Sequence, residues 1–498
     1  MSDDQSQGSP SVADLFFDWY HIPVLGVVVA VMAAIRLQAY DIFIRDGSVY
    51  FSGNDAWYHL REVEYTVRNW PFTMPFDPWT QFPYGTSVGQ FGTLYDQIIA
   101  TAALAVGLGS PSQELIAKTL LVAPVVFGSL VALPVYAIGK RLAGRVAGVF
   151  GAVVLLLLPG QFLQRGLVGF ADHNIAEPFF QTIAVFALMI AIGVATREKP
   201  VWELVVDRDV DALRQPLLWS ALAGVAVALY MWVWPPGILL VGIFGAYLVY
   251  QLTSDYVTGG SPEPVAFVGV VSMVVTALVM LVQFETTSFS PVEYSLLQPV
   301  VALSVAGGAA LMAGLARAFD GRDLDRRYYP VAVVGIFAVA ATVVAVALPS
   351  LFGQIQSNTL RFIGFSAGAA PRTISEAQPY LDPGLLRQNA MNATGRIMSD
   401  YGFTLFTGVV AVIWLLAKPL VRDGETERVA YAAGSLSLIG LMFVVPGPFR
   451  AVGDAFGVVS ELVGVVLVAA ILFGAVLQSS YDPEELLFVI WAAFITSA

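Results

Sequence analysis

Long apolar runs recur along almost the whole chain, separated by short polar loops and by three longer polar segments. Each run holds about 16 to 24 residues, close to the ~20 residues that cross the hydrocarbon core of a bilayer as a helix. A membrane β-strand would alternate apolar and polar residues over ~10 positions, whereas these runs are apolar on every face. Because backbone polar groups in lipid need internal partners, the pattern predicts an all-α polytopic membrane protein.

The pattern predicts about thirteen transmembrane helices. We expect them at residues 22–40, 117–139, 143–158, 175–195, 217–234, 237–252, 265–283, 296–316, 329–348, 402–417, 430–446, 455–478 and 484–498. The apolar stretch 97–109 is too short to cross a bilayer, so we expect it to be re-entrant or interfacial. Residues 1–20 are polar and acidic, without the positive start of a signal peptide, and are expected to form a cytoplasmic tail.

Three polar segments, 41–96, 159–174 and 349–401, interrupt the predicted membrane domain of residues 21–498. They follow the first, third and ninth predicted helices, so all three lie on one side of the membrane. The short loops on the other side carry 14 of the 25 basic residues, which are Lys140, Arg141, Arg145, Arg197, Lys199, Arg208, Arg214, Arg317, Arg322, Arg326, Arg327, Lys418, Arg422 and Arg428. Positive loops are cytoplasmic, so the three segments are expected to face outward from the cell membrane.

The net charge, the lysine content and the cysteine content of the chain limit its possible partners and indicate the kind of organism it comes from. The formal net charge of -12 argues against nucleic-acid binding. Only 4 of the 25 basic residues are lysine, and an acidic, lysine-poor membrane protein suggests a halophilic source. The absence of cysteine excludes disulfides and cysteine metal sites.

The first two outward segments contain clusters of side chains that can carry chemistry. In the first, Asp55 and His59 are four residues apart, so a helix would place them on one face. The alternative for Asp55, which follows Gly-Asn, is a turn or a helix cap. In the second, Asp172, His173, Asn174 and Glu177 offer oxygen and nitrogen donors within six residues. Asp172 and Asn174 suit a hard cation, or alternatively cap the helix that follows, and capping does not exclude metal binding.

The third outward segment contains Thr373-Ile374-Ser375-Glu376 in a loop of about fifty residues, a length that is usually functional or disordered. An outward Asp55, an Asp172-His173-Asn174 loop and this motif, in this order, resemble the catalytic subunit of archaeal oligosaccharyltransferase. The stretches Phe82–Thr86 and Trp232–Gly237 are similar to that family as well. The resemblance covers the whole chain in order.

The resemblance implies a membrane glycosyltransferase of GT-C architecture. Such an enzyme transfers a lipid-linked oligosaccharide from polyprenyl (dolichyl) phosphate or diphosphate to the asparagine of Asn-X-Ser/Thr in acceptor proteins. The reaction is metal-dependent, with Mn²⁺ or Mg²⁺ as the divalent cation, and inverts the sugar. The family's soluble C-terminal domain with its Trp-Trp-Asp-Tyr-Gly motif is missing from this sequence, which therefore resembles the catalytic membrane half of a single-subunit enzyme.

The same resemblance assigns roles to individual residues. The metal ligands would be Asp55, Asp172, Asn174 and Glu376, and the catalytic residues would be Asp55, Glu376 and Arg165. Substrate contacts would come from His173 at the lipid-linked phosphate and from Trp234 and Arg450.

Two other protein classes remain as alternatives. Other polyprenyl-phosphate-dependent membrane glycosyltransferases share the architecture but lack a late Thr-Ile-X-Glu motif, so Glu376 distinguishes them. Transporters place ionisable residues inside their spans, near the midplane of the bilayer. The concentration of carboxylates in loops, and the lack of an internal repeat, favours an enzyme.

Overall fold

The fold was analysed in a computed structural model. It describes residues 19–197, 201–350, 352–353, 386–387, 390–404, 434, 437, 447–456 and 482–497. The chain divides into two compact units. The first holds residues 1–88, 93–186 and 400–404, and the second holds residues 89–92, 187–399 and 405–498. Helix α8 runs from one unit into the other, because Ala187 lies within it.

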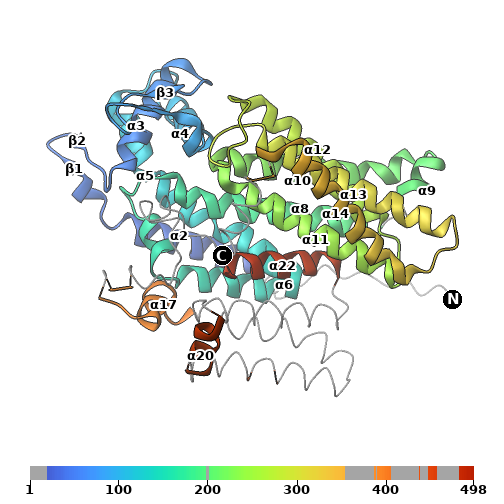
Figure 1. Ribbon diagram of the computed structural model, residues 1–498. Coiled ribbons are helices and arrows are strands. Elements are labelled where there is room, and N and C mark those ends of the chain that lie inside the picture. The colour runs from blue at the N-terminus through green and yellow to red at the C-terminus, as the bar shows by residue number, and fades with distance from the viewer. Residues whose placement is uncertain are drawn as a thin grey trace, which may run out of the picture. The chain divides into compact units, whose positions relative to one another are not determined.

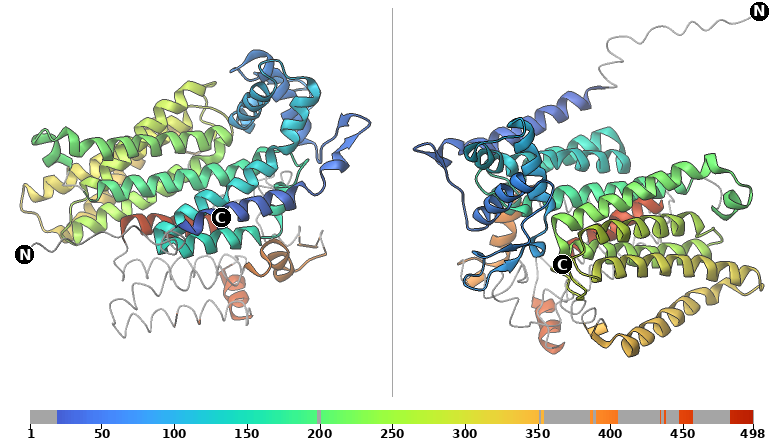
Figure 2. Two further views of the ribbon diagram at one scale, coloured as in Figure 1. Left: turned by 180° about the vertical axis from the view of Figure 1, so that it is seen from behind. Right: turned by 90° about the horizontal axis from the view of Figure 1, so that it is seen from above.

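The first unit is a group of helices joined by loops, of which the connection from α3 to α4 is the longest. Its helical elements are α2 (His21–Leu37), η1 (Tyr40–Phe43), α3 (Asp55–Asn69), α4 (Leu94–Val106), α5 (Gln113–Leu130), α6 (Ala132–Leu156), α7 (Gln161–Arg165), η3 (His173–Ile175) and the start of α8 (Ala176–Ala195). Helix α2 packs on α5 and α6, and α3 and α4 pack on each other and on α5 (Figure 2). Two antiparallel hairpins of two-residue strands complete it, β1 (Ile44–Arg45) with β2 (Ser48–Val49) and β3 (Phe76–Asp77) with β4 (Thr86–Ser87).

Helix α6 contains a reversal of the chain rather than one continuous helix. The backbone leaves the helical region at Ala143 and Gly144, and Gly144 has φ +87°, which glycine adopts at little steric cost. Beyond the turn, Gly148 lies directly against Tyr136 and Gly139. The two halves therefore run back along each other, as expected from the two separate spans predicted at 117–139 and 143–158.

The second unit is a layered bundle of longer helices. Its elements are η2 (Val88–Phe91, from Gly89), α9 (Val201–Val206), α10 (Val210–Val233), η4 (Pro235–Gly237), α11 (Ile238–Val257), α12 (Glu263–Met280), η5 (Leu281–Gln283), α13 (Leu297–Asp320), η6 (Arg326–Tyr328), α14 (Tyr329–Ala347), most of α17 (Ala393–Tyr401), α20 (Gly447–Phe456) and α22 (Pro483–Ser497). Helix α12 packs against α10 and α13, while α11 packs against α13 and α22 (Figure 1).

Seven apolar helical segments among the described residues are long enough to cross a membrane. They are Gln113–Leu156 with its internal turn, His173–Ala195, Val210–Val233, Pro235–Val257, Glu263–Gln283, Leu297–Asp320 and Arg326–Ala347. Helices α2 and α4, with 17 and 13 residues, are shorter. The predicted all-α membrane fold is therefore confirmed. The count of thirteen stays a prediction, since the spans at 402–417, 430–446 and 455–478 lie almost wholly outside the described residues.

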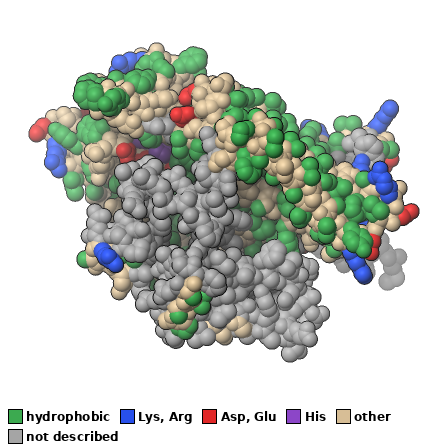
Figure 3. Space-filling model, viewed as in Figure 1, with side chains coloured by type: hydrophobic (Ala, Val, Ile, Leu, Met, Phe, Trp, Pro, Cys, Tyr) green, Lys and Arg blue, Asp and Glu red, His purple; other side chains and the backbone are tan. Residues whose placement is uncertain are grey.

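Apolar side chains that are exposed on the protein surface indicate which surfaces contact lipid. On α14, Val331, Val334, Val339 and Val346 are each more than 60% exposed. Figure 3 shows hydrophobic side chains over much of the described surface in view. An apolar surface of this extent would be unfavourable in water, so it belongs in a bilayer.

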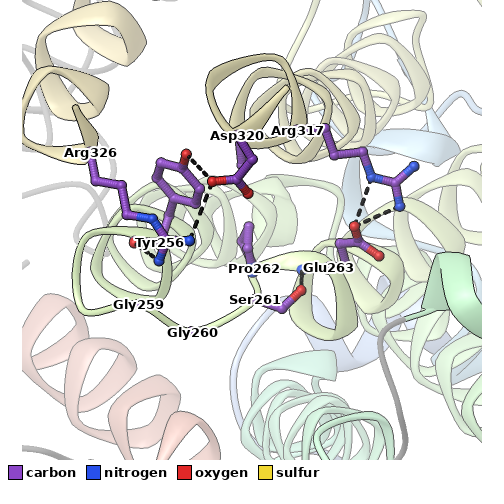
Figure 4. Close-up of a pocket in the computed structure, with 10 residues that line it drawn as sticks. Tyr256, Gly259, Gly260, Ser261, Pro262, Glu263, Arg317, Asp320 and Arg326 are labelled. Atoms are coloured by element: carbon purple, nitrogen blue, oxygen red, sulfur yellow. Dashed lines mark hydrogen bonds and ion pairs between the residues drawn. The ribbon is translucent and has the colours of Figure 1, made fainter. Parts of the chain in front are cut away.

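A cluster of paired charges ties together the ends of α11, α12, α13 and η6 (Figure 4). Arg317 donates from Nε and Nη2 to Glu263 Oε1 at 2.7 and 2.6 Å. Tyr256 donates to Asp320 at 2.8 Å, and the Arg326 guanidinium lies 4.8 Å from the Tyr256 ring centroid. These residues lie at or beside the short loops that the sequence predicts to be cytoplasmic, and their pairing marks a structural contact between helix ends.

Candidate active site

The loop at residues 159–174 gathers three of the predicted site residues around the buried carboxylate of a fourth, Asp172. Asp172 is 3% exposed and caps η3, accepting from the Asn174 backbone amide at 3.4 Å. The Asn174 side chain donates to Asp172 Oδ2, and Arg165 Nη1 lies 3.6 Å from the same oxygen. His173 Nδ1 lies 2.9 Å from Asp172 Oδ1. The predicted cap is therefore confirmed, and the same carboxylate is the centre of a polar cluster.

His59 joins this cluster from the polar segment 41–96. Its Nε2 lies 3.6 Å from Asp172 Oδ1 and 3.3 Å from His173 Nδ1. Its Nδ1 lies 2.8 Å from Asp96 Oδ1, and both side chains are 1% exposed. The sequence indicated His59 only as a neighbour of Asp55, and it gave no role to Asp96, which lies in the first turn of the apolar helix α4.

The charges in the cluster stabilise each other. Burial alone would raise the pKa of Asp172, but His173 and His59 beside it hold that pKa well below its usual range. Burial alone would lower the pKa of His59, but the Asp96 and Asp172 carboxylates outweigh it and raise the pKa to about 10. Asp172 is therefore an anion at neutral pH and is available to a cation.

The cluster fits a divalent metal ion. Ligand atoms of His59, Asp172 and His173 all lie within 4.8 Å of one another, and all three residues are largely buried. Once an ion has displaced the second proton of each ring, a carboxylate oxygen with imidazole nitrogens is a donor set used by first-row divalent metals. Of the predicted acidic ligands that the structure describes, Asp172 belongs to this group and Asp55 does not. Asn174 donates its side-chain NH₂ to Asp172, and its role as a ligand stays a prediction.

The other predicted site residues lie elsewhere in the described structure or outside it. Asp55 is exposed and begins α3, one helical turn before His59. Trp234 ends α10, with its backbone amide bonded to the Tyr230 carbonyl at 3.1 Å, and belongs to the second unit. Arg450 lies in α20 of the same unit. Glu376 lies outside the described residues.

A buried arginine supports the loop that carries Arg165 and Asp172. Arg36 of α2 is 1% exposed, and its guanidinium lies 5.1 Å from the Phe162 ring centroid. A Cβ on Gly166 would lie 2.6 Å from Arg36 Nε, so a larger residue there would force the buried Arg36 side chain to shift. The Arg36 carbonyl also accepts from the Val168 amide at 3.0 Å. The loop is therefore fixed to the first predicted transmembrane helix.

Helix α3 also buries a carboxyl group without a partner. Glu62 is 0% exposed, and neither of its oxygens has a hydrogen-bond partner among the described residues. Burial raises the pKa of Glu62 to about 9, and the nearby Asp96 carboxylate adds to this shift. The group is therefore neutral in the folded protein at pH 7, whereas it ionises in the unfolded chain.

Replacing Glu62 is expected to make the protein more stable at alkaline pH. The folded pKa lies above the unfolded one, so stability falls as pH rises from about 4.5 to about 9. Glu62→Gln removes this loss and should stabilise the fold by about 1–3 kcal/mol at pH 8, and by almost nothing at pH 5. Thermal unfolding in detergent at both pH values measures the difference, with the exposed Glu203→Gln as control. An equal effect of both variants at pH 8 would contradict the burial argument.

Comparison with known proteins places this arrangement in a known class. The fold matches an archaeal oligosaccharyltransferase from Archaeoglobus fulgidus, solved with an inhibitory peptide and a dolichol-phosphate, with a TM-score of 0.69 and 22% identity over 97% of this chain and 56% of that one. A second structure from that organism, a complex with Zn and sulfate, matches with a TM-score of 0.61 and 24% identity, over 95% of this chain and 53% of that one. The predicted GT-C membrane glycosyltransferase fold is confirmed.

The family follows from the sequence match. A family model described as oligosaccharyl transferase STT3, N-terminal, matches residues 24–416, and the chain belongs to this family. The dolichyl-monophosphooligosaccharide–protein glycotransferase AglB of Haloferax volcanii is 60% identical over 498 residues, which are all of this chain and 47% of the relative. The chain thus spans about half the length of the relatives that it matches. The halophilic source of this relative agrees with the acidic, lysine-poor composition.

Proposed function

We propose that the protein transfers an oligosaccharide from dolichyl phosphate or diphosphate to the asparagine side chain of Asn-X-Ser/Thr in proteins. The observation that carries the proposal is the buried Asp172 carboxylate with Arg165, His173 and His59 around it, in a chain of the STT3 family. The name of the Haloferax volcanii relative, a glycotransferase that uses a dolichyl-phosphate-linked donor, supports the substrate class. The dolichol-phosphate bound to the matched Archaeoglobus fulgidus oligosaccharyltransferase supports it as well.

The side chains of the site supply what this transfer needs. An asparagine amide is a poor nucleophile because its nitrogen lone pair is delocalised into the carbonyl. Asp55 and Glu376 would accept hydrogen bonds from its NH₂ and twist it out of conjugation. The nitrogen then attacks the anomeric carbon, the bond from that carbon to the lipid-phosphate oxygen breaks, and the amide proton passes to one of these carboxylates. Attack opposite the leaving group inverts the sugar.

The leaving group is a lipid phosphate on which negative charge develops. Arg165 is positioned beside Asp172, and His173 next to it offers a second donor, so both can stabilise that charge. A divalent cation, Mn²⁺ or Mg²⁺, would supply further stabilisation as a Lewis acid, with Asp172 and the adjacent imidazoles holding it. An ion held by these residues would also neutralise the Asp172 anion.

The membrane setting accounts for the lipid-linked donor. The polyprenyl tail stays in lipid between apolar helices while the sugar faces the outer side of the cell membrane, where the polar segments 41–96 and 159–174 are proposed to lie. Acceptor proteins reach the site from that side. The protein is proposed to act as a single subunit.

Acceptor specificity tests the proposed function. The full-length protein in detergent is incubated with extracted lipid-linked oligosaccharide and an Asn-Val-Thr peptide, with a Gln-Val-Thr peptide as matched control. We expect mass spectrometry to show glycan on the asparagine of the first peptide and none on the second. Transfer of sugar to a lipid acceptor, with both peptides unmodified, would instead indicate another polyprenyl-phosphate-dependent glycosyltransferase.

A further inference from the structure

We propose that Asn392 is itself an acceptor of the oligosaccharide, so that the protein is modified on its own polar segment 349–401. This segment contains Asn392-Ala393-Thr394, which has the Asn-X-Ser/Thr sequence of an N-glycosylation acceptor. It is the single tripeptide of this kind in the 498 residues. The inference rests on the proposed function for the reaction that adds the sugar, and it adds one substrate, the chain itself.

The side chain of Asn392 is exposed at the start of helix α17 (Figure 1). Its Oδ1 accepts from the Gly395 backbone N–H at 2.6 Å, and its carbonyl accepts from the Arg396 backbone N–H at 2.9 Å. Asn392 is therefore the N-cap of the helix. Among the described residues, its side-chain NH₂ has no hydrogen-bond partner. The nitrogen to which a glycan attaches is thus accessible, while the oxygen of the same amide holds the helix cap.

The far end of α17 contacts the loop that carries the candidate active site. The backbone of Asp400 lies directly against Gly160, where a side chain would not fit, and both residues belong to the first unit. Because α17 is continuous, Asn392 lies about 12 Å from Asp400 along the helix, at 1.5 Å per residue. The sequon is therefore connected by a short polar helix to the loop 159–174, on the side where the transfer is proposed to occur.

The first turn of α17 is weak enough to open and present the sequon. The helix has 9 residues, and isolated helices shorter than about 12–15 residues are marginal in water. Gly395 lies in this first turn, and glycine destabilises a helix relative to alanine. Opening of one terminal turn frees Asn392 and Thr394 from the helical conformation without unfolding the membrane helices.

The modification uses the reaction already proposed for other acceptor proteins. Asn392 Nδ2 forms a bond to the anomeric carbon of the lipid-linked oligosaccharide, and the bond from that carbon to the lipid-phosphate oxygen breaks. The phosphate leaves with the electron pair of that bond, and one amide proton passes to a carboxylate of the enzyme copy that carries out the transfer. The product keeps its Oδ1, so a glycan on Asn392 is compatible with the cap to Gly395.

Mass spectrometry of one tryptic peptide tests the inference. Cleavage after Arg387 and Arg396 releases peptide 388–396, which holds Asn389 as well as Asn392. Asn389 is followed by Ala-Met and is not a sequon, so it is an internal control. In full-length protein produced in Haloferax volcanii, the source of the 60% identical glycotransferase, we expect glycan on Asn392 and none on Asn389. A peptide 388–396 without glycan would overturn the inference.

Two substitutions of Thr394 distinguish recognition of the sequon from simple exposure of the asparagine. Thr394→Ala keeps Asn392 but removes the hydroxyl that completes the sequon, so the glycan should be lost. Thr394→Ser keeps the hydroxyl and should keep the glycan. Glycan that remains on Asn392 in Thr394→Ala would contradict the inference, because the modification would not follow the Asn-X-Ser/Thr rule.

A reaction with purified components separates this inference from the proposed function. Full-length protein from a host without N-glycosylation is incubated with extracted lipid-linked oligosaccharide and an Asn-Val-Thr peptide. Glycan on both the peptide and Asn392 supports both proposals. Glycan on the peptide, with Asn392 unmodified in protein from either host, overturns the inference alone. Glycan on Asn392 in the archaeal host, with neither acceptor modified by the purified protein, supports the inference and contradicts the proposed function.

Discussion

Asp172→Asn is expected to lower the rate of oligosaccharide transfer to a sequon peptide by about 100- to 1000-fold, since the site loses several kcal/mol of charge stabilisation. Asp172 contacts Arg165, His173, Asn174 and His59 at the same time. Asparagine has the same shape and still accepts hydrogen bonds, but it carries no charge to hold a cation. The loss should appear in kcat, because the charge matters most when the phosphate leaves.

The measurement is initial-rate transfer by the full-length protein to a fluorescent Asn-Val-Thr peptide. The matched control is Asp211→Asn, an exposed carboxylate in the first turn of α10. This control should transfer at the parent rate. If Asp172→Asn retained transfer within about tenfold of the parent, the cluster would not be the reaction centre.

Asp55→Ala and Glu376→Ala should each abolish transfer without unfolding the protein. Both carboxylates are proposed to hold the acceptor amide, and its nitrogen does not attack while it is conjugated with the carbonyl. Asp55 begins α3 and is exposed, so its side chain is not part of a packed apolar core. The same peptide assay measures the loss, and thermal unfolding checks the fold. Exposed Asp41→Ala and Glu203→Ala serve as controls.

The two variants also distinguish an oligosaccharyltransferase from other polyprenyl-phosphate-dependent glycosyltransferases. Glu376 lies in the late motif that other polyprenyl-phosphate-dependent glycosyltransferases lack. Retained activity in either variant would remove that residue from the proposed site. A loss of activity in Asp55→Ala with full activity in Glu376→Ala would favour the other class of glycosyltransferase.

Local sequence predicted those parts of the site that lie close together in the chain. Asp172, His173 and Asn174 are consecutive, so a short capped loop is enough to bring them together, and Arg165 ends the helix just before that loop. The membrane helices were predictable because an apolar run of sufficient length has few other stable states in lipid. The reversal at Gly144 was predictable from the short polar interruption near Lys140 and Arg141.

The part of the site formed by His59 and Asp96 depends on tertiary contacts, which the sequence pattern does not predict. His59 and Asp96 are 37 residues apart and meet only because α3 packs against α4. One signal was present in the sequence: His59, Glu62 and Thr66 recur at helical spacing, and all three are buried in the structure. Polar residues on the buried face of a helix indicate function more often than stability, because burial without partners costs free energy. Asp96 gave no such signal, since a single carboxylate at a helix start also suits the helix dipole.

The most direct test of metal-dependent transfer to asparagine is a Mn²⁺ titration in which bound metal and transfer are measured in the same samples. The full-length protein is first stripped with EDTA, and glycopeptide is quantified by mass spectrometry at each Mn²⁺ concentration. The proposed mechanism predicts no transfer by metal-free protein, and recovery of transfer along the same curve as metal binding. Full transfer to the Asn-Val-Thr peptide by protein without bound metal would contradict it.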